Sequence, residues 1–197
     1  MNTITKIIMV SFVAMFIENT IFARALGTST MLIAAKNKKQ LVGFGLSITY
    51  ITSVASAISY FADKLFLANE SSYLFMPMIY VVIVGLVYIL TLLILWKFVY
   101  RVFISMKKYV HISSFNCAVL GALFLNSKSS DTFLGYIGFG LGTGIGFMIA
   151  TYFLSIAYEK LYSEDVPDSF RGYPLILVYI GILSMAFYGL IGHQLML

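Results

Sequence analysis

One cysteine and a few polar residues inside apolar segments are the side chains whose chemistry stands out in this 197-residue sequence. Cys117 ends the stretch Ser113-Ser114-Phe115-Asn116-Cys117, and small and apolar residues follow it. Two interpretations fit this pattern: the cysteine packs as a small buried hydrophobe, or its thiolate binds iron. Because iron–sulfur clusters usually take four ligands, the second interpretation requires cysteines from elsewhere. Composition alone does not choose between them.

Other candidate residues have a structural explanation beside the functional one. Glu18 and Arg24 are six residues apart, so they do not share a face of a continuous helix. They are either solvated residues at the end of a helix or a buried functional group with its partner. Glycines at alternate positions from Gly138 to Gly146 could suggest a nucleotide loop, but inside an apolar segment they favour close helix packing. The sequence contains no phosphate-binding motif, no pair of metal-binding histidines and no nucleophile with a base.

The composition places these residues in a membrane. Hydrophobic residues make up 60% of the chain and charged residues 11%, against about a quarter charged in soluble domains. The apolar residues form long runs, and about 20 such residues cross a bilayer as a helix. We therefore predict an all-α integral membrane protein with a single membrane domain, residues 1–197. The six predicted transmembrane helices are residues 4–22, 41–61, 73–96, 110–125, 133–158 and 173–193.

The positive residues indicate how these helices are oriented. With six spans, ten of the thirteen lysines and arginines flank the first, third and fifth loops. Because positive residues are retained on the cytoplasmic side, both termini are predicted to lie outside. The net charge of +5 is thereby explained by topology, and we expect no nucleic-acid partner. The ten residues are Arg24, Lys36, Lys38, Lys39, Lys97, Arg101, Lys107, Lys108, Lys160 and Arg171; the other three are Lys6, Lys64 and Lys128.

The two halves of the chain resemble each other. Gly43-Phe44-Gly45-Leu46 recurs 95 residues later as Gly138-Phe139-Gly140-Leu141, and Asn19 with Leu26-Gly27 has a counterpart in Asn116 with Leu120-Gly121. Three spans per half make this an inverted repeat, approximately residues 1–100 and 101–197. Such repeats place a functional site at mid-depth, between interrupted helices in corresponding positions. The interrupted segments are predicted at residues 19–30 and 116–126.

At these positions the sequence resembles the Rnf/Nqr membrane subunits, namely the A-type subunit of Rnf complexes and the E-type subunit of sodium-pumping NADH:quinone reductase. The strongest match is Asn116-Cys117-Ala118-Val119-Leu120-Gly121, ending in Leu125-Asn126. Further matches follow in the same order over nearly the whole chain. They are Asn19, Phe22, Leu26-Gly27, Lys38-Lys39 and Gly43 to Leu46 in the first half, and Val166-Pro167, Phe170-Arg171-Gly172, Gly181 to Phe187 and Gly189 in the second.

The resemblance implies a subunit that pairs with a homologous partner of opposite topology. In the family, the two partners hold a 2Fe-2S cluster at the membrane centre, and each gives one cysteine from each half. The second-half cysteine corresponds to Cys117. The first-half cysteine stands two residues after Leu-Gly, where this sequence has Ser29, and a serine binds iron poorly compared with a thiolate. Asn19 and Asn116 complete the candidate cofactor-binding residues.

The implied function is that of a subunit in an ion-translocating oxidoreductase of the inner, or cytoplasmic, membrane. Electrons would pass through the shared cluster, coupled to sodium or proton transport, together with other Rnf/Nqr-type subunits. No motif for flavin, nicotinamide or quinone is present, so this multi-pass chain is expected to be non-catalytic alone. The alternative is a divergent member that keeps the fold without the cluster and acts as a membrane scaffold or small-solute transporter.

Overall fold

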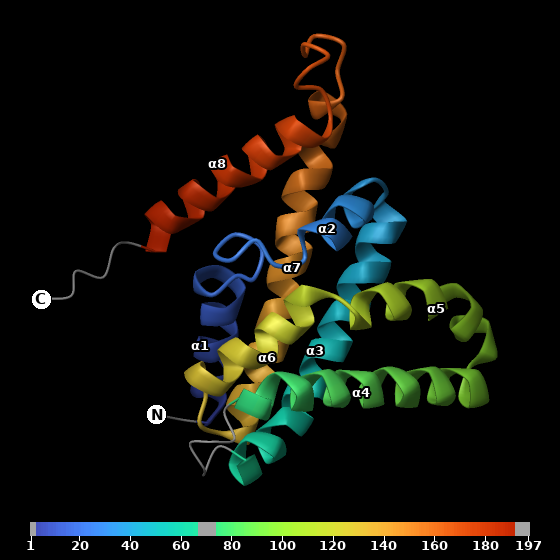
Figure 1. Cartoon of the computed structure of the whole chain (residues 1–197), viewed down its shortest axis with the longest axis vertical. Coiled ribbons are helices and arrows are strands. Elements are labelled where there is room, and N and C mark those ends of the chain that lie inside the picture. The colour runs from blue at the N-terminus through green and yellow to red at the C-terminus, as the bar shows by residue number, and fades with distance from the viewer. Residues whose placement is uncertain (1–2, 67–73, 192–197) are drawn as a thin grey trace, which may run out of the picture.

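The computed structural model describes residues 3–66 and 74–191, and this part of the chain is helical, without strands (Figure 1). Two non-helical breaks interrupt it near the centre of the fold. The first break, residues 18–27, follows the π-helix η1, and the second break, Phe115 and Asn116, follows α5. The helices in chain order are α1 (Thr3–Phe12), η1 (Val13–Ile17), α2 (Thr28–Ala35), α3 (Lys38–Phe66), α4 (Met76–Phe98), α5 (Tyr100–Ser114), α6 (Cys117–Ser129), α7 (Phe133–Leu161) and α8 (Tyr173–Ile191).

The helices of the described residues agree with a membrane protein of several spans. Three of them, α3, α4 and α7, are long and apolar enough to cross a bilayer, and the bent pair of α5 and α6 would make a fourth span. The segments Ile4–Ile17 and Tyr173–Gly189 are apolar but shorter. Six spans therefore remain a prediction. The predicted span limits at Tyr73 and His193 lie outside the described residues.

Two predicted spans differ from the helices observed. The span predicted at residues 110–125 is not one helix, because α5 and α6 are bent by 56° at Phe115 and Asn116. The span predicted at residues 4–22 ends earlier, at Ile17, through a π-helix. The interruption in the second half consequently precedes Cys117, whereas residues 117–126 are helical. Helix α2 was not predicted, since its eight residues are too few to give a hydropathy signal.

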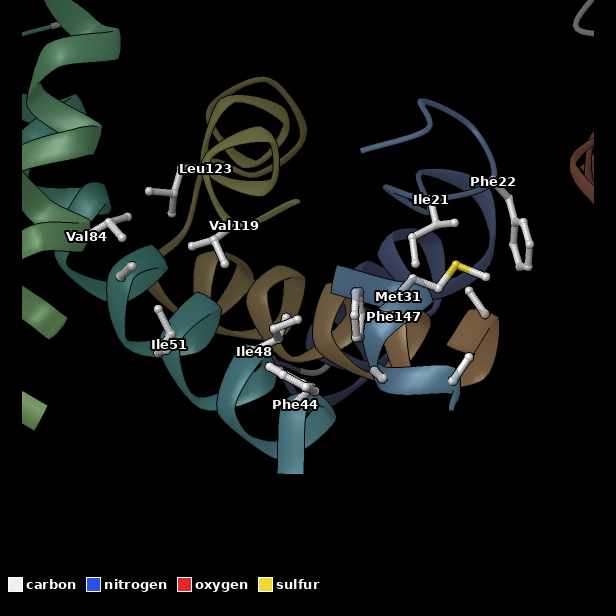
Figure 2. Packing of buried hydrophobic residues seen from close by; sticks show 14 of the residues in the cluster. Ile21, Phe22, Met31, Phe44, Ile48, Ile51, Val84, Val119, Leu123 and Phe147 are labelled. Carbon is white, nitrogen blue, oxygen red and sulfur yellow. The ribbon is translucent and has the colours of Figure 1, made fainter. Parts of the chain in front are cut away.

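The core lies where α3 and α7 cross. Both helices have 29 residues, and glycines let their backbones touch: a Cβ on Gly140 would lie 2.8 Å from the Cα of Ser53. The Thr52 hydroxyl donates to the carbonyl of Gly140 at 2.9 Å. Buried apolar side chains from the first break, α2, α3, α4, α6 and α7 pack around this crossing (Figure 2). Close packing through small residues is the usual way in which membrane helices associate.

The remaining helices extend from this core in two directions. Helices α4 and α5 lie side by side, and α8 leaves the bundle on the opposite side (Figure 1). Large apolar side chains on α4 and α8 are exposed, among them Met78, Leu86, Leu93, Ile182 and Met185. In a membrane protein such faces contact lipid or another subunit.

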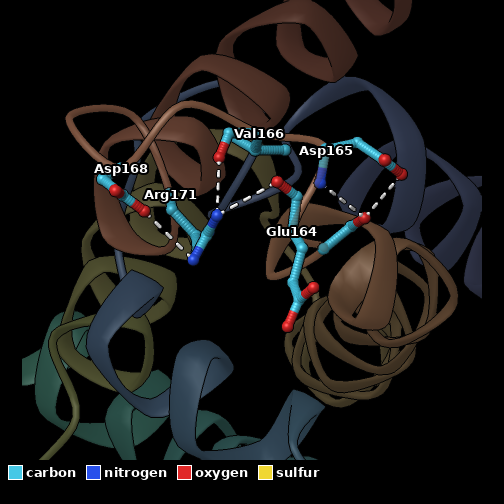
Figure 3. A network of polar contacts seen from close by, with 6 residues as sticks. Glu164, Asp165, Val166, Asp168 and Arg171 are labelled. Atoms are coloured by element: carbon cyan, nitrogen blue, oxygen red, sulfur yellow. Dashed lines mark hydrogen bonds and ion pairs between the residues drawn. The ribbon is translucent and has the colours of Figure 1, made fainter.

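Arg171 organises the connection between α7 and α8 (Figure 3). Its guanidinium donates to the carbonyls of Glu164 and Val166 at 3.1 and 3.0 Å, and it pairs with Asp168 at 3.1 Å. The next residue, Gly172, has a φ of +83°, which favours glycine. The contacts of its side chain give Arg171 a structural role in this loop, and the positive φ gives one to Gly172.

Candidate functional site

The two breaks meet at the centre of the molecule. A Cβ on Gly27 would lie 2.8 Å from the Cβ of Ala118, and a Cβ on Gly121 would collide with the side chain of Leu26. Residues about 90 positions apart in sequence are thus in direct contact. The prediction that the Asn19–Gly27 region packs against the Asn116–Gly121 region agrees with these contacts.

Asn19 builds the first break. Its Oδ1 accepts hydrogen bonds from the backbone N–H groups of Ile21 and Phe22 at 3.0 and 3.2 Å, and its Nδ2 donates to the carbonyl of Met15 at 2.8 Å. Asparagine commonly forms such turns with the backbone that follows it. The chain then passes through Ala25 and Gly27, both with positive φ, before α2 begins. Asn19 is buried, and in the single chain its hydrogen bonds serve the backbone.

Asn116 builds the second break in a similar way. It has an extended backbone and caps α6, because its Oδ1 accepts from the N–H of Ala118 at 3.0 Å. Its Nδ2 is buried and has no hydrogen-bond partner among the residues the structure describes. Of the two serines that precede it, Ser114 donates to the carbonyl of Val110 on its own helix.

Cys117 is the first residue of α6 and is exposed in the single chain. Its Sγ lies 3.0 Å from the backbone nitrogen of Gly27, which donates to it across the two breaks. The interpretation of this cysteine as a small buried hydrophobe therefore does not describe its position. The starts of α2 and α6 meet at this point, and the partial positive charge of helix N-termini favours a negatively charged ligand or side chain.

Ser29 lies in the first turn of α2, two residues after Gly27, and is exposed. The structure thus brings the segment carrying Ser29 to the segment carrying Cys117. A single cysteine is present in the whole sequence, and the described residues contain no group of three or more histidine, cysteine or acidic side chains that could hold a metal. At this junction the chain alone offers two possible metal ligands, the sulfur of Cys117 and the hydroxyl of Ser29.

An open pocket of about 430 Å³ borders Cys117. Its walls include Leu26, Leu120 and Phe124, and two cations, Arg24 and Lys128, also line it. Sequence reasoning placed these two cations on opposite faces of the membrane. Their common pocket shows that Arg24 belongs to the break rather than to the first loop, so it cannot count toward the orientation.

Glu18 and Arg24 form an ion pair with 2.9 Å between the oxygen and the nitrogen. The sequence argument against their contact assumed a continuous helix, and the break after Ile17 removes that condition. The pair closes the turn that Asn19 begins. Both side chains are partly exposed, Arg24 at 47% and Glu18 at 30%, so the pair contributes little to stability on its own.

Comparison with known proteins identifies the family. A family model described as Rnf-Nqr subunit, membrane protein, matches residues 7–194. The A-type subunit of the Na(+)-translocating ferredoxin:NAD(+) oxidoreductase complex from Acetobacterium woodii is 28% identical, and the match covers 96% of this chain and 98% of that protein. The A-type subunit of the ion-translocating oxidoreductase complex from Glaesserella parasuis is 26% identical, over 89% of this chain and 91% of its own length. This chain therefore belongs to the Rnf-Nqr subunit family of membrane proteins.

Proposed function

We propose that this chain is the A-type membrane subunit of an ion-translocating oxidoreductase complex. In this role it carries electrons through a 2Fe-2S cluster shared with a homologous subunit, and the electron flow is coupled to sodium or proton transport. The observation that carries the proposal is the position of Cys117: an exposed thiol at the junction of two helix starts, facing a backbone N–H donor. The names of the A-type relatives support membership in such a complex.

The residues at the junction fit half of a shared cluster. Cys117 would supply a thiolate, the N–H of Gly27 already points at its sulfur, and hydrogen bonds to sulfur tune the potential of such clusters. When bound, a 2Fe-2S cluster supplies one-electron transfer. Since the chain has one cysteine, the remaining thiolates must come from a second subunit. The exposure of Cys117 in the single chain supports this arrangement, because a partner then has access to the site.

The architecture we infer is an inverted repeat in the cytoplasmic membrane, with a partner of opposite topology. Helices α3 and α7 have equal length and begin 95 residues apart, the same offset at which the Gly-Phe-Gly-Leu sequence recurs. Each is preceded by a broken segment, and the breaks are in contact. These features support a pseudo-two-fold site at mid-depth, as in other inverted-repeat membrane proteins.

The proposal is tested by purifying the chain with its complex and recording its absorption and electron paramagnetic resonance spectra. The wild-type complex should be brown and give a cluster signal, which Cys117→Ser should abolish while the protein stays folded. Ser29→Cys should increase cluster retention during purification, since a thiolate replaces a weak ligand. Ser29→Ala is the matched control and should lower retention if the hydroxyl is a ligand. A colourless complex whose activity survives Cys117→Ala would reject the redox role.

Ser29 also gives the second candidate function its support. If the missing first-half cysteine means that no cluster is held, the chain is a divergent member that serves as a scaffold or small-solute transporter. The pocket of about 430 Å³ beside Cys117, with Arg24 and Lys128 in its wall, would then receive a small anion. Iron content separates the two functions, because this alternative predicts none in the wild-type complex.

A further inference from the structure

A second polar site lies away from the two breaks, where the end of α3, the end of α6 and the start of α7 converge. A pocket of about 160 Å³ opens there, and two carboxylates, Asp63 and Asp131, line it. Ser127, Ser130 and Tyr136 also form its wall, and Lys64 is among the lining residues. The volume is sufficient for an ion with a few waters, at roughly 30 Å³ per water.

Asp63 is 4% exposed, which is rare for an acidic residue in an apolar bundle. Its Oδ1 accepts a hydrogen bond from the Tyr80 hydroxyl at 2.8 Å, and its Oδ2 accepts one from the Tyr136 hydroxyl at 2.7 Å. Each carboxylate oxygen retains a further lone pair. The two tyrosines thus fix the carboxylate in place and leave acceptor capacity for a cation.

Ser130 points to a ligand independently of the carboxylates. Its side chain is 7% exposed and borders the pocket, yet its hydroxyl has no hydrogen-bond partner among the described residues. Leaving a buried hydroxyl without a hydrogen-bond partner is unfavourable, so this wall of the pocket has an unmet hydrogen bond that a ligand could satisfy. The neighbouring Asn126 donates to the carbonyl of Tyr136 at 3.0 Å, which holds α6 against α7 beside the pocket.

The charges around the pocket favour a cation of single charge. Asp63 and Asp131 contribute two negative charges, and Lys64 contributes one positive charge. Lys64 lies over the Tyr60 ring, 4.8 Å from its centroid, and neither ion pair found in the described residues involves it. The C-termini of α3 and α6 and the N-terminus of α7 meet here, and two C-termini against one N-terminus leave a partial negative charge that attracts cations. A net charge of about −1 remains beside oxygen-bearing side chains, which suits a hard cation.

We propose that this pocket binds a hard monovalent cation such as sodium, held by Asp63 and Asp131 with the Ser130 hydroxyl as a neutral ligand. The inference rests on the proposed function and deepens it, since it gives the transported ion a site in this subunit, but the binding itself requires no cluster. The competing structural explanation is that Asp63 only braces α3, α4 and α7 through the two tyrosines. The two explanations differ in what they predict for Ser130.

The test measures ²²Na⁺ binding by the full chain in lipid nanodiscs, together with the unfolding temperature in sodium chloride and in choline chloride. Sodium should raise the unfolding temperature of the wild type relative to choline, because a ligand bound to the folded state stabilises it. Asp131→Asn and Ser130→Ala should each weaken sodium binding about tenfold or more. Lys64→Gln should strengthen it, because a competing positive charge is removed. Asp165→Asn, which removes an exposed carboxylate in the α7–α8 connection, is the matched control and should change nothing.

The structural explanation predicts the opposite result for Ser130→Ala: the protein becomes more stable in both salts, since a buried hydroxyl without a partner is removed, and sodium binding is unchanged. That result, or equal stabilisation by choline, would overturn the proposal. Asp63→Asn is informative only if the protein folds, so the inference rests on Asp131 and Ser130. Cys117→Ser should bind sodium like the wild type, because the ion site does not use the thiol. A wild-type complex that is colourless and still binds sodium would refute the cluster and keep the ion site.

Discussion

Among single residues, Gly27 meets the strictest requirements in the candidate site. Its φ is +84°, a conformation that costs side-chain-bearing residues about 1–2 kcal/mol. It also packs against Ala118 and Asn116 and donates its N–H to Cys117. One glycine therefore allows the turn into α2, the contact between the two breaks and the hydrogen bond to the thiol.

Gly27→Ala should therefore destabilise the protein by about 2–4 kcal/mol, from the positive φ and from a Cβ placed 2.8 Å from that of Ala118. Thermal unfolding of the purified chain in detergent measures the effect. Gly85→Ala is the matched control, because no atom lies within 4 Å of a Cβ at that position in α4, and it should be neutral or slightly stabilising. Equal behaviour of the two variants would contradict the described turn.

At the scale of elements, the α3–α7 crossing depends on glycines of α7. The backbone of α3 occupies the space that a side chain at these positions would need. Gly140→Ala would place a Cβ 2.8 Å from the carbonyl oxygen of Thr52 and from the Cα of Ser53. Because backbone atoms cannot rotate away, we expect a loss of about 1–3 kcal/mol, measured as a lower unfolding temperature. Gly181→Ala in α8 meets no atom within 4 Å and is expected to leave that temperature unchanged or raise it.

Long helices were predictable because their apolar runs are continuous. The predicted span at residues 133–158 lies within α7, and the one at residues 41–61 lies within α3. The break at Phe115 and Asn116 was placed inside a span, since hydropathy does not register a single extended residue. The repeat did predict an interrupted segment at residues 116–126, and the break lies at its start, because Asn116 caps a new helix that begins at Cys117.

The candidate site was only partly predictable. Repeat offsets indicated that the segments of Asn19 and Asn116 correspond, and the structure brings their breaks together. The ion pair of Glu18 with Arg24 and the pocket shared by Arg24 and Lys128 depend on the turn between η1 and α2. The Asp63 network could not be found from sequence, because its tyrosines lie 17 and 73 residues away.

For the molecule as a whole, the distribution of positive charge still predicts both termini outside. The structure places Arg24 at the first break, so it no longer counts. Nine lysines and arginines still flank the first, third and fifth loops, of the ten counted from the sequence. The remaining bias follows the rule that positive residues stay in the cytoplasm. The polar end at Asp63 and Asp131 would then face outside, opposite to the loop that Arg171 organises.

This topology can be tested by cysteine labelling in intact cells, in a Cys117→Ala background so that no native thiol reacts. Asn37→Cys and Asp165→Cys should resist a membrane-impermeant maleimide until the cells are permeabilised, because the positive residues beside both positions hold these loops in the cytoplasm. Leu197→Cys, which lies outside the described residues, should react at once. Labelling of Asn37→Cys and Asp165→Cys in intact cells, together with protection of Leu197→Cys, would reverse the orientation and place the Asp63 pocket on the cytoplasmic side. Equal labelling at all three positions would show that the count of spans is wrong.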